Sequence, residues 1–191
     1  MASDQDKWNA RYTENISSEL TPAAVLSTCE HLLPSSGKTL DLACGKGANA
    51  IFLAELNLES HAWDISDVVI NQLKELANNQ GLTIHAVARD VVLQPPEHES
   101  FDVIVVSRFL DRDLISALKH AICPGGYIFY QTFIKDKVDA EGPENPEYRL
   151  DQNELLSLFQ DWIIRYYREE GTIGDTSAGF RNQAMLVAQK N

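Results

Sequence analysis

Short apolar segments alternate with amphipathic helical segments along most of this chain, and this alternation constrains its fold more than any other feature. The first unit consists of an apolar run at residues 39–43, two glycines, and a helical pattern over residues 50–56. Alternating strands and helices are typical of a parallel sheet with helices on both faces. The sequence therefore predicts a Rossmann-like, doubly wound α/β fold. Its further strands are expected at 60–65, 82–88, 101–107 and 127–133, and its further helices at 66–80 and 113–122.

Both ends of the chain depart from this alternation. Thr21 is the expected N-cap of an opening helix with Pro22 in its first turn, and Pro34 ends it, so residues 1–34 are predicted to form an N-terminal helical cap. After a long loop at 134–150 and a helix at 151–159, two apolar stretches are expected to form a C-terminal antiparallel hairpin, at 162–168 and 184–188. With 191 residues, the chain is expected to be a single domain spanning 1–191.

Charge and apolar run length narrow the range of partners. The chain has 16 basic and 28 acidic residues and a net charge of −12, which disfavours nucleic acid and anionic membrane surfaces. Its aliphatic runs are far shorter than the roughly 18 residues of a membrane-spanning helix. The N-terminus is polar and acidic, unlike a secretory signal. We therefore expect a cytoplasmic protein without a nucleic-acid or membrane partner.

Cysteine and histidine spacing predicts neither disulfides nor a metal. The three cysteines form no CxxC pair, and an odd number in a cytoplasmic protein favours free thiols. The five histidines show no spacing typical of zinc ligands. On this basis no metal site is expected.

A glycine-rich turn and three strand-end aspartates mark the expected ligand site. Gly45 and Gly47 lie between a strand and a helix, where a ligand can approach the backbone at a helix N-terminus. Asp41, Asp64 and Asp90 each fall at or just after the end of a predicted strand. Each could simply cap a helix or start a turn, but together they would line the crevice in which open α/β sheets bind ligands. Several carboxylates suit a ligand with hydroxyls, an amine and a cation better than a pyrophosphate.

A nicotinamide-dependent oxidoreductase is the alternative enzyme class. The turn fits GxGxxA, and Asp64 lies close to the roughly 20-residue offset of a ribose-binding acid. Two observations weaken this alternative. None of the six tyrosines is followed by lysine in a Tyr-x-x-x-Lys pattern, and a single domain leaves no room for a separate substrate domain.

The chain resembles class I S-adenosylmethionine-dependent methyltransferases, and among them the tellurite-resistance-like group and its thiopurine-methyltransferase relatives. The resemblance extends over nearly the whole chain and rests on seven segments: WNARY at 8–12, DLACGKG at 41–47, WDIS at 63–66, ARD at 88–90, FDVIVVSRFL at 101–110, CPGGYIFYQTF at 123–133 and ENPEYRL at 144–150. It implies S-adenosyl-L-methionine as the cofactor.

The resemblance also assigns residues to parts of that cofactor. Asp41, Gly45 and Gly47 would face the methionine moiety, and Ala43 replaces a glycine that is frequent in this motif. The other cofactor contacts that the resemblance implies are Asp64 at the ribose, Ile65, Asp90 and Val91 at the adenine, and Ser107 below the sulfonium. Trp8, Arg11 and Tyr12 are expected on an N-terminal segment that closes over the site, because such side chains are costly on a polar helical arm without a partner; the alternative is a helix that packs Trp8 on the core.

The resemblance implies that the acceptor is a small molecule, such as a chalcogen oxyanion, a thiol or a heterocycle. Aromatic walls and arginines that fork to an oxyanion would suit it. The residues expected to bound it lie above the fourth and fifth strands and in the following loop: Arg108, Phe109, Tyr130, Phe133, Tyr148 and Arg149.

Two alternatives remain open for this site. The two arginines could instead pair with the acidic residues of the 136–154 stretch. No dedicated acid–base residue is identified, and a non-catalytic cofactor-binding sensor or partner subunit would show the same features. The sequence predicts no oligomeric state.

Overall fold

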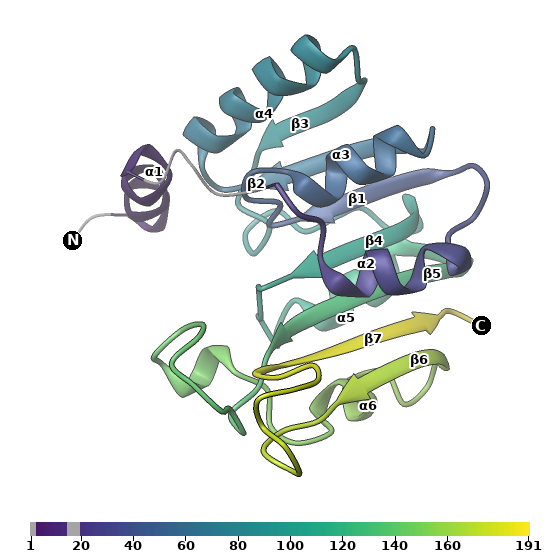
Figure 1. The fold of residues 1–191 in the computed structure, drawn as a ribbon. Coiled ribbons are helices and arrows are strands. Elements are labelled where there is room, and N and C mark those ends of the chain that lie inside the picture. Colours follow the sequence, from purple (N-terminus) through teal and green to yellow (C-terminus); the bar gives the residue numbers. More distant parts are fainter. Residues whose placement is uncertain (1–2, 15–19) are drawn as a thin grey trace.

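A seven-stranded mixed sheet forms the centre of the protein (Figure 1). The computed structural model describes residues 3–14 and 20–191. The strand order is β3-β2-β1-β4-β5-β7-β6, and β7 runs antiparallel to both of its neighbours. This arrangement confirms the predicted doubly wound sheet and its C-terminal hairpin. The strands are β1 (Lys38–Leu42), β2 (Glu59–Asp64), β3 (Ile84–Ala88), β4 (Phe101–Ser107), β5 (Ile122–Phe133), β6 (Ile163–Glu169) and β7 (Gln183–Gln189).

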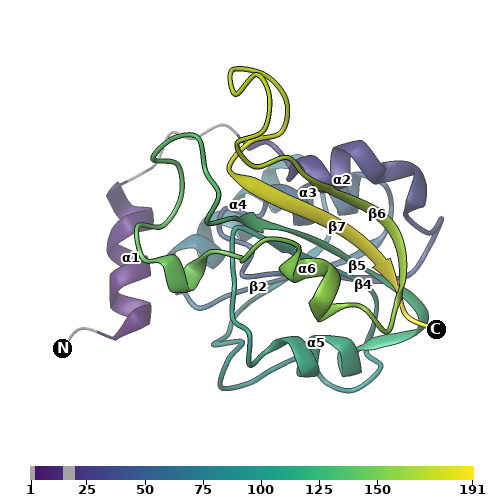
Figure 2. The same ribbon diagram turned by 90° about the horizontal axis from the view of Figure 1, so that it is seen from below.

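Helices cover both faces of the sheet. In Figure 2, α2 and α3 lie on one side of it, and α5 and α6 lie on the other. None of the helices in the described part of the chain is long and apolar enough to cross a membrane. The helices are α1 (Asp4–Glu14), α2 (Ala24–Cys29), η1 (Glu30–Leu32), α3 (Ala48–Glu55), α4 (Asp67–Gln80), α5 (Ile115–Ala121), η2 (Pro146–Tyr148) and α6 (Glu154–Leu158).

Strand β4 is central and buried on both faces, as its uninterrupted apolar run predicts. Val103 and Val105 pack in the cluster that contains α2, whereas Ile104 and Val106 pack in the cluster that contains α5 and α6. Successive side chains of a strand point to opposite faces, so a single strand contributes to both cores.

The opening helix starts later than its sequence pattern predicts. Helix α2 begins at Ala24, so the prediction of Thr21 as its N-cap is wrong. The amide of Ala23 donates to Asn49 Oδ1 at 2.8 Å, and the amide of Val25 donates to Gln131 Oε1 at 2.8 Å. Side chains from α3 and β5 therefore satisfy the free amides that a local N-cap would otherwise satisfy.

Several predicted boundaries also shift. The predicted turn at 124–126 lies within β5, where Phe101 pairs with Ile122 and Val103 pairs with Tyr127, so that residues 123–126 form an irregularity in the ladder. Strand β3 starts two residues later than expected, at Ile84. The helices predicted at 113–122 and 151–159 are shorter at both ends, as α5 and α6.

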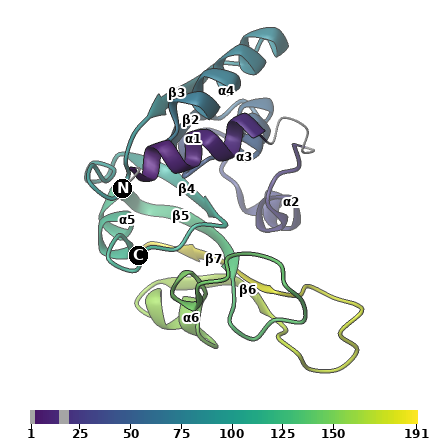
Figure 3. The same ribbon diagram turned by 90° about the vertical axis from the view of Figure 1, so that its left-hand side faces the viewer.

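Helix α1 lies beside the edge at which the parallel strands end (Figure 3). No residue of α1 is buried, so Trp8 is not part of the core. Asn9 holds the helix to the start of α4: its Nδ2 donates to Asp67 Oδ1 at 2.8 Å, and its Oδ1 accepts from Ser66 Oγ at 2.6 Å. Within the predicted cap at 1–34, residues 1–2 and 15–19 lie outside the described part of the chain. The cap and the single domain stay predictions.

Candidate functional site

The glycine turn between β1 and α3 is shaped by left-handed backbone conformations. Gly47 has φ +79°, and a Cβ at this position would lie 2.5 Å from the methyl carbons of Leu73. A Cβ on Gly45, with φ +52°, would lie 3.0 Å from the Tyr12 hydroxyl. Ala43 adopts φ +54°, a conformation that costs a residue with a Cβ about 1 kcal/mol or more. The glycine frequent in this motif avoids that strain.

Asp41 is fully buried at the end of β1. Its Oδ1 accepts from Asn49 Nδ2 at 3.0 Å, and its Oδ2 accepts from the Ala50 amide at 3.2 Å. Burial raises the pKa of Asp41 to about 8, although both hydrogen bonds act in the opposite sense. A cation bound beside Asp41 would favour its ionised form.

Asp64 joins the turn after β1 to the turn after β2. Its Oδ2 accepts from the Gly45 amide at 2.8 Å, and its Oδ1 accepts from the Ser66 amide at 2.9 Å. Burial raises the pKa of Asp64 above its usual value. Each oxygen retains a second lone pair that can accept from a ligand hydroxyl.

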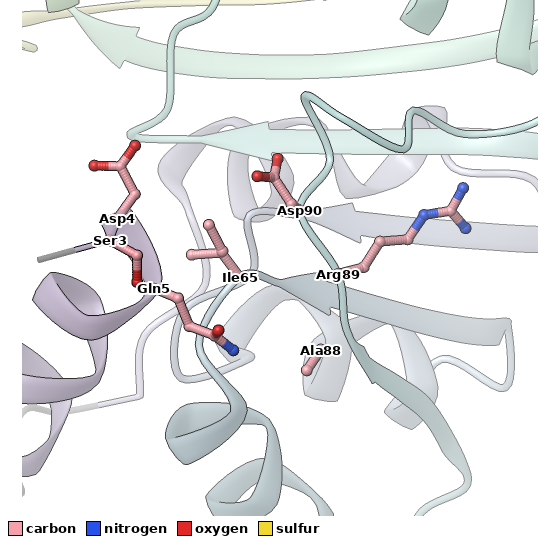
Figure 4. A pocket seen from close by; sticks show the side chains of 7 residues that line it. All are labelled: Ser3, Asp4, Gln5, Ile65, Ala88, Arg89 and Asp90. Carbon is pink, nitrogen blue, oxygen red and sulfur yellow. The ribbon is translucent and has the colours of Figure 1, made fainter.

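A cavity of about 300 Å³ lies between the ends of β2 and β3 and the first turn of α1. Figure 4 shows Ile65 and Asp90 on one side of it and Asp4 and Gln5 on the other, whereas Arg89 extends away. The Arg89 guanidinium lies 4.0 Å from the Trp63 ring centroid. Ser3 and Ala88 complete the lining, and the predicted contact Val91 is buried.

One Asp90 oxygen is already engaged by the backbone of its own turn. Its Oδ1 accepts from the amides of Val92 and Leu93 at 3.0 and 3.1 Å. These bonds fix the carboxylate at the cavity wall. The other oxygen can accept from an amino group of a ligand.

Asn49 connects several parts of this site, although no sequence pattern singles it out. Its Nδ2 donates both to Asp41 and, at 3.0 Å, to Ser107 Oγ at the end of β4, and its Oδ1 accepts from Ala23 at the start of α2. The side chain is buried. Its partners lie 8 to 58 residues away along the chain, so no local motif could have indicated them.

Replacing Asn49 by alanine is expected to lower the free energy of unfolding by about 2 kcal/mol, because the amide of Ala23 and the carboxyl of Asp41 both lose a buried partner. Urea denaturation measures this change. Asn79→Ala, on the exposed side of α4, is the matched control and is expected to have little effect. Equal stability of the two variants would contradict the role of Asn49.

Of the three aromatic and basic residues predicted on the N-terminal segment, Tyr12 lies against the glycine turn at Gly45. Trp8 stacks on Tyr12 with centroids 5.9 Å apart, and Arg11 lies 5.1 Å from the Trp8 ring centroid. Burial, together with the nearby Asp64, raises the pKa of Tyr12 well above its usual range. The Tyr12 hydroxyl therefore keeps its proton and stays a hydrogen-bond donor beside Gly45.

The predicted acceptor residues divide between the surface and the core. Arg108 is exposed at the end of β4, where its amide donates to the Gln131 carbonyl at 2.8 Å; its guanidinium makes no hydrogen bond or ion pair with the described residues. Tyr130 is fully buried and its hydroxyl donates to the carbonyl of the half-buried Phe109 at 3.1 Å. The structure thus places Tyr130 inside the core and not on an open wall.

Arg149 lies inside the loop that follows β5. Only 2% of it is exposed, and its guanidinium donates to the carbonyl oxygens of Ile134 at 2.9 Å, Pro143 at 2.8 Å and Glu141. It also lies 5.6 Å from the Phe133 ring centroid. Its partners are backbone oxygens and not the acidic side chains of the alternative interpretation, so it ties the loop to the end of β5.

The loop that contains Arg149 also holds the predicted residue Tyr148 and contacts Arg112, which was not predicted. Tyr148 is exposed. Arg112, which sequence reasoning missed, pairs with Glu154 at 2.6 Å and donates to the carbonyls of Glu147 and Arg149. Arg112 and Arg149 therefore hold the loop in place. Of the two arginines predicted at the acceptor site, Arg108 is the one whose charge is exposed to solvent.

The strand order, the antiparallel β7 and the carboxylate-lined turn define the fold of class I S-adenosylmethionine-dependent methyltransferases. The model of the family described as "Tellurite resistance protein TehB" matches residues 4–186. The chain belongs to the TehB family, which confirms the predicted resemblance.

Individual relatives agree with this assignment. The probable S-adenosyl-L-methionine-dependent methyltransferase TehB of Haemophilus influenzae is 28% identical over 175 residues, which are 86% of this chain and 57% of that protein. The chain thus spans about half the length of the curated relatives it matches.

Two solved structures share the fold. The crystal structure of Haemophilus influenzae TehB superposes with a TM-score of 0.73 at 24% identity, covering 96% of this chain and 67% of that one. A structure described for the conversion of a disulfide bond into a thioacetal group during echinomycin biosynthesis gives 0.74 at 20% identity, covering 99% and 94%. At these identities the superpositions support the fold alone.

Proposed function

We propose that this chain is an S-adenosylmethionine-dependent methyltransferase with a small-molecule acceptor. The observation that carries the proposal is the placement of Asp41, Asp64 and Asp90 at or just after the carboxyl ends of three adjacent strands, on the edge that holds the glycine turn. Carboxyl groups of this kind can accept from an amine, from ribose hydroxyls and from an adenine amino group. The cavity beside Ile65 and Asp90 offers a place for the adenine.

The same carboxyl groups argue against a dinucleotide. A pyrophosphate at the glycine turn would lie beside Asp41 and Asp64 and could bind there only with both carboxyl groups protonated, because two anions close together repel each other. A sulfonium and an ammonium would instead be attracted. This difference favours S-adenosylmethionine over NAD at the turn.

When bound, the cofactor would supply a methyl group on a positively charged sulfur. Such a transfer needs alignment of the acceptor with the methyl group and exclusion of water more than it needs an acid or a base. Asp41, positioned by Asn49, would hold the amino group of the cofactor, and Tyr12 would cover the turn. Ser107, held by Asn49, would fix the end of β4 next to the reacting groups.

For the acceptor, the family description points to tellurite, and the exposed Arg108 suits a small oxyanion. Release of S-adenosylhomocysteine distinguishes a methyltransferase from a non-catalytic cofactor-binding protein. Incubation with S-adenosylmethionine and tellurite is expected to release S-adenosylhomocysteine above the rate without acceptor, whereas a pure binder releases none with any acceptor tested.

Calorimetry tests the cofactor directly. The protein is expected to bind S-adenosylhomocysteine and not NAD, and Asp64→Ala is expected to weaken this binding by about 1.5–3 kcal/mol, typical of hydrogen bonds to charged groups. Asp113→Ala, an exposed aspartate before α5, is the control and should bind normally. Circular dichroism must show that both variants are folded at the temperature used. Binding of NAD without binding of S-adenosylhomocysteine would overturn the proposal.

A further inference from the structure

We propose that Glu59, His61 and His85 form a binding site for a divalent transition-metal ion such as Zn²⁺ or Ni²⁺ on the outer face of β2 and β3. One ligand atom from each residue lies within 4.8 Å of the others. The site is separate from the glycine turn and independent of the proposed methyltransferase activity.

The strand register brings these three side chains together. His61 on β2 pairs directly with His85 on the parallel strand β3, and their rings stack with centroids 4.6 Å apart. Glu59 precedes His61 by two residues and therefore projects from the same face. Its Oε1 lies 3.0 Å from His61 Nε2. Ligand atoms on a tetrahedral zinc ion are about 3.3 Å apart, given bonds of about 2.0–2.1 Å, so this pair already has a suitable spacing.

Packing restrains His61 on one side, whereas Glu59 and His85 are exposed to solvent. Phe101 packs its ring against His61 with centroids 5.5 Å apart, which restricts rotation of the imidazole. The His61 side chain is 16% exposed and that of Glu59 is 55% exposed, and His85 is exposed. Residues 89–100, which connect β3 to β4, contain no helix that could cover this part of the sheet. An ion can therefore reach the site and keep water ligands.

The chemistry of the ligand set favours borderline metals. Two imidazoles and one carboxylate are typical ligands of zinc, nickel and copper, and are less suited to magnesium or calcium, which prefer oxygen alone. The Nε2 of His61 faces Glu59, and the ring proton would be carried on Nδ1 when a metal binds Nε2.

One charge opposes the ion. Lys38 on β1 is paired in register with Glu59, and its Nζ lies over the Phe101 ring at 5.1 Å from the centroid. Its positive charge lowers the affinity for a cation without blocking a ligand atom. Removing this charge is therefore expected to strengthen metal binding.

The position on the strand separates this site from the cofactor edge. Glu59 is the first residue of β2 and Asp64 is the last. At about 3.3 Å per residue, the two ends are roughly 16 Å apart. Metal binding is thus expected to leave the affinity for S-adenosylhomocysteine unchanged.

The experiment is a calorimetric titration of the untagged protein, once with NiCl₂ and once with ZnCl₂. One ion per chain is expected to bind. The double variant His61→Gln/His85→Gln is expected to lose at least tenfold in affinity, and Lys38→Gln is expected to gain. The control is His98→Gln/His120→Gln, which removes the other neighbouring pair of histidines, with ring centroids 6.2 Å apart.

The outcomes decide between this site and non-specific binding. Loss of the one-to-one step in the first double variant, with the control unchanged, supports the proposal. Absence of saturable binding, or equal losses in the two double variants, overturns it. Failure of S-adenosylhomocysteine to bind while the metal step persists would overturn the proposed function and leave the metal site standing.

Discussion

The free energy of unfolding of the cofactor-free protein is expected to decrease as the pH rises from about 5 to about 8, and Asp41→Asn is expected to remove most of this decrease. Burial raises the pKa of Asp41 to about 8 in the folded protein, against a usual value of 3.8. Between these two values the folded state keeps a proton that the unfolded state has lost. Raising the pH therefore favours unfolding in this range.

The magnitude follows from proton linkage. One proton difference changes the free energy of unfolding by roughly 1.4 kcal/mol per pH unit, so wild type should lose roughly 4 kcal/mol relative to the variant over three units. Above pH 8 the difference becomes constant, because Asp41 is then ionised in both states. Urea denaturation of both proteins at several pH values measures it.

Asp161→Asn provides the control, because the pKa of Asp161 is shifted in the opposite direction to that of Asp41. A hydrogen bond from Lys119 holds the pKa of Asp161 below its usual value, so its contribution is lost as the pH falls and is constant between pH 5 and 8. A wild-type slope that persists in Asp41→Asn would show that another group carries the proton.

Those parts of the site that follow from local pattern were predictable from the sequence. Gly45 and Gly47 are needed because the backbone is left-handed between a strand and a helix. This requirement is local, so a few neighbouring residues are enough to predict it. Asp41 and Asp64 were found because parallel strands bring their carboxyl ends to one edge. The burial of β4 on both faces followed from its uninterrupted apolar run.

The features that sequence reasoning missed depend on contacts between distant segments. Asn49 caps α2 and holds Asp41, but its partners are fixed only once β1, β4 and α2 are packed together. His61 and His85 lie 24 residues apart and meet through the register of β2 and β3, which spacing along one chain segment cannot show. Arg149 has the chemistry of an anion-binding residue, and only the folded loop shows that backbone oxygens surround it.

The residues that directly follow β1 and β4 both have a left-handed backbone conformation. Ala43 and Arg108, which follow these adjacent strands, both adopt φ +54° although neither is glycine. Strained residues that persist in a folded protein are often found at functional sites. At Arg108 the strained backbone is held by the Gln131 carbonyl, and the side chain is directed to solvent beside Ser107. This position lies next to the proposed location of the transferred methyl group.

Arg108→Ala is therefore expected to reduce kcat/KM for tellurite by roughly 10- to 150-fold, mainly through KM, because a guanidinium paired with an oxyanion contributes about 1.5–3 kcal/mol. The affinity for S-adenosylhomocysteine and the thermal stability should change little, since the side chain has no partner among the described residues. Arg108→Lys keeps the charge without the fork and is expected to recover part of the loss. The steady-state rate of S-adenosylhomocysteine release gives kcat and KM for wild type, Arg108→Ala and Arg108→Lys.

Two further variants separate acceptor binding from structure. Arg165→Ala removes an exposed arginine that bonds Gln189 at the far edge of the sheet, and it should turn over tellurite like wild type. Arg149→Ala is expected to lower the thermal stability as well as turnover, because three carbonyl oxygens lose a buried donor. If Arg108→Ala turns over tellurite at the wild-type rate, the acceptor does not bind at the end of β4, and the strained backbone there needs another explanation.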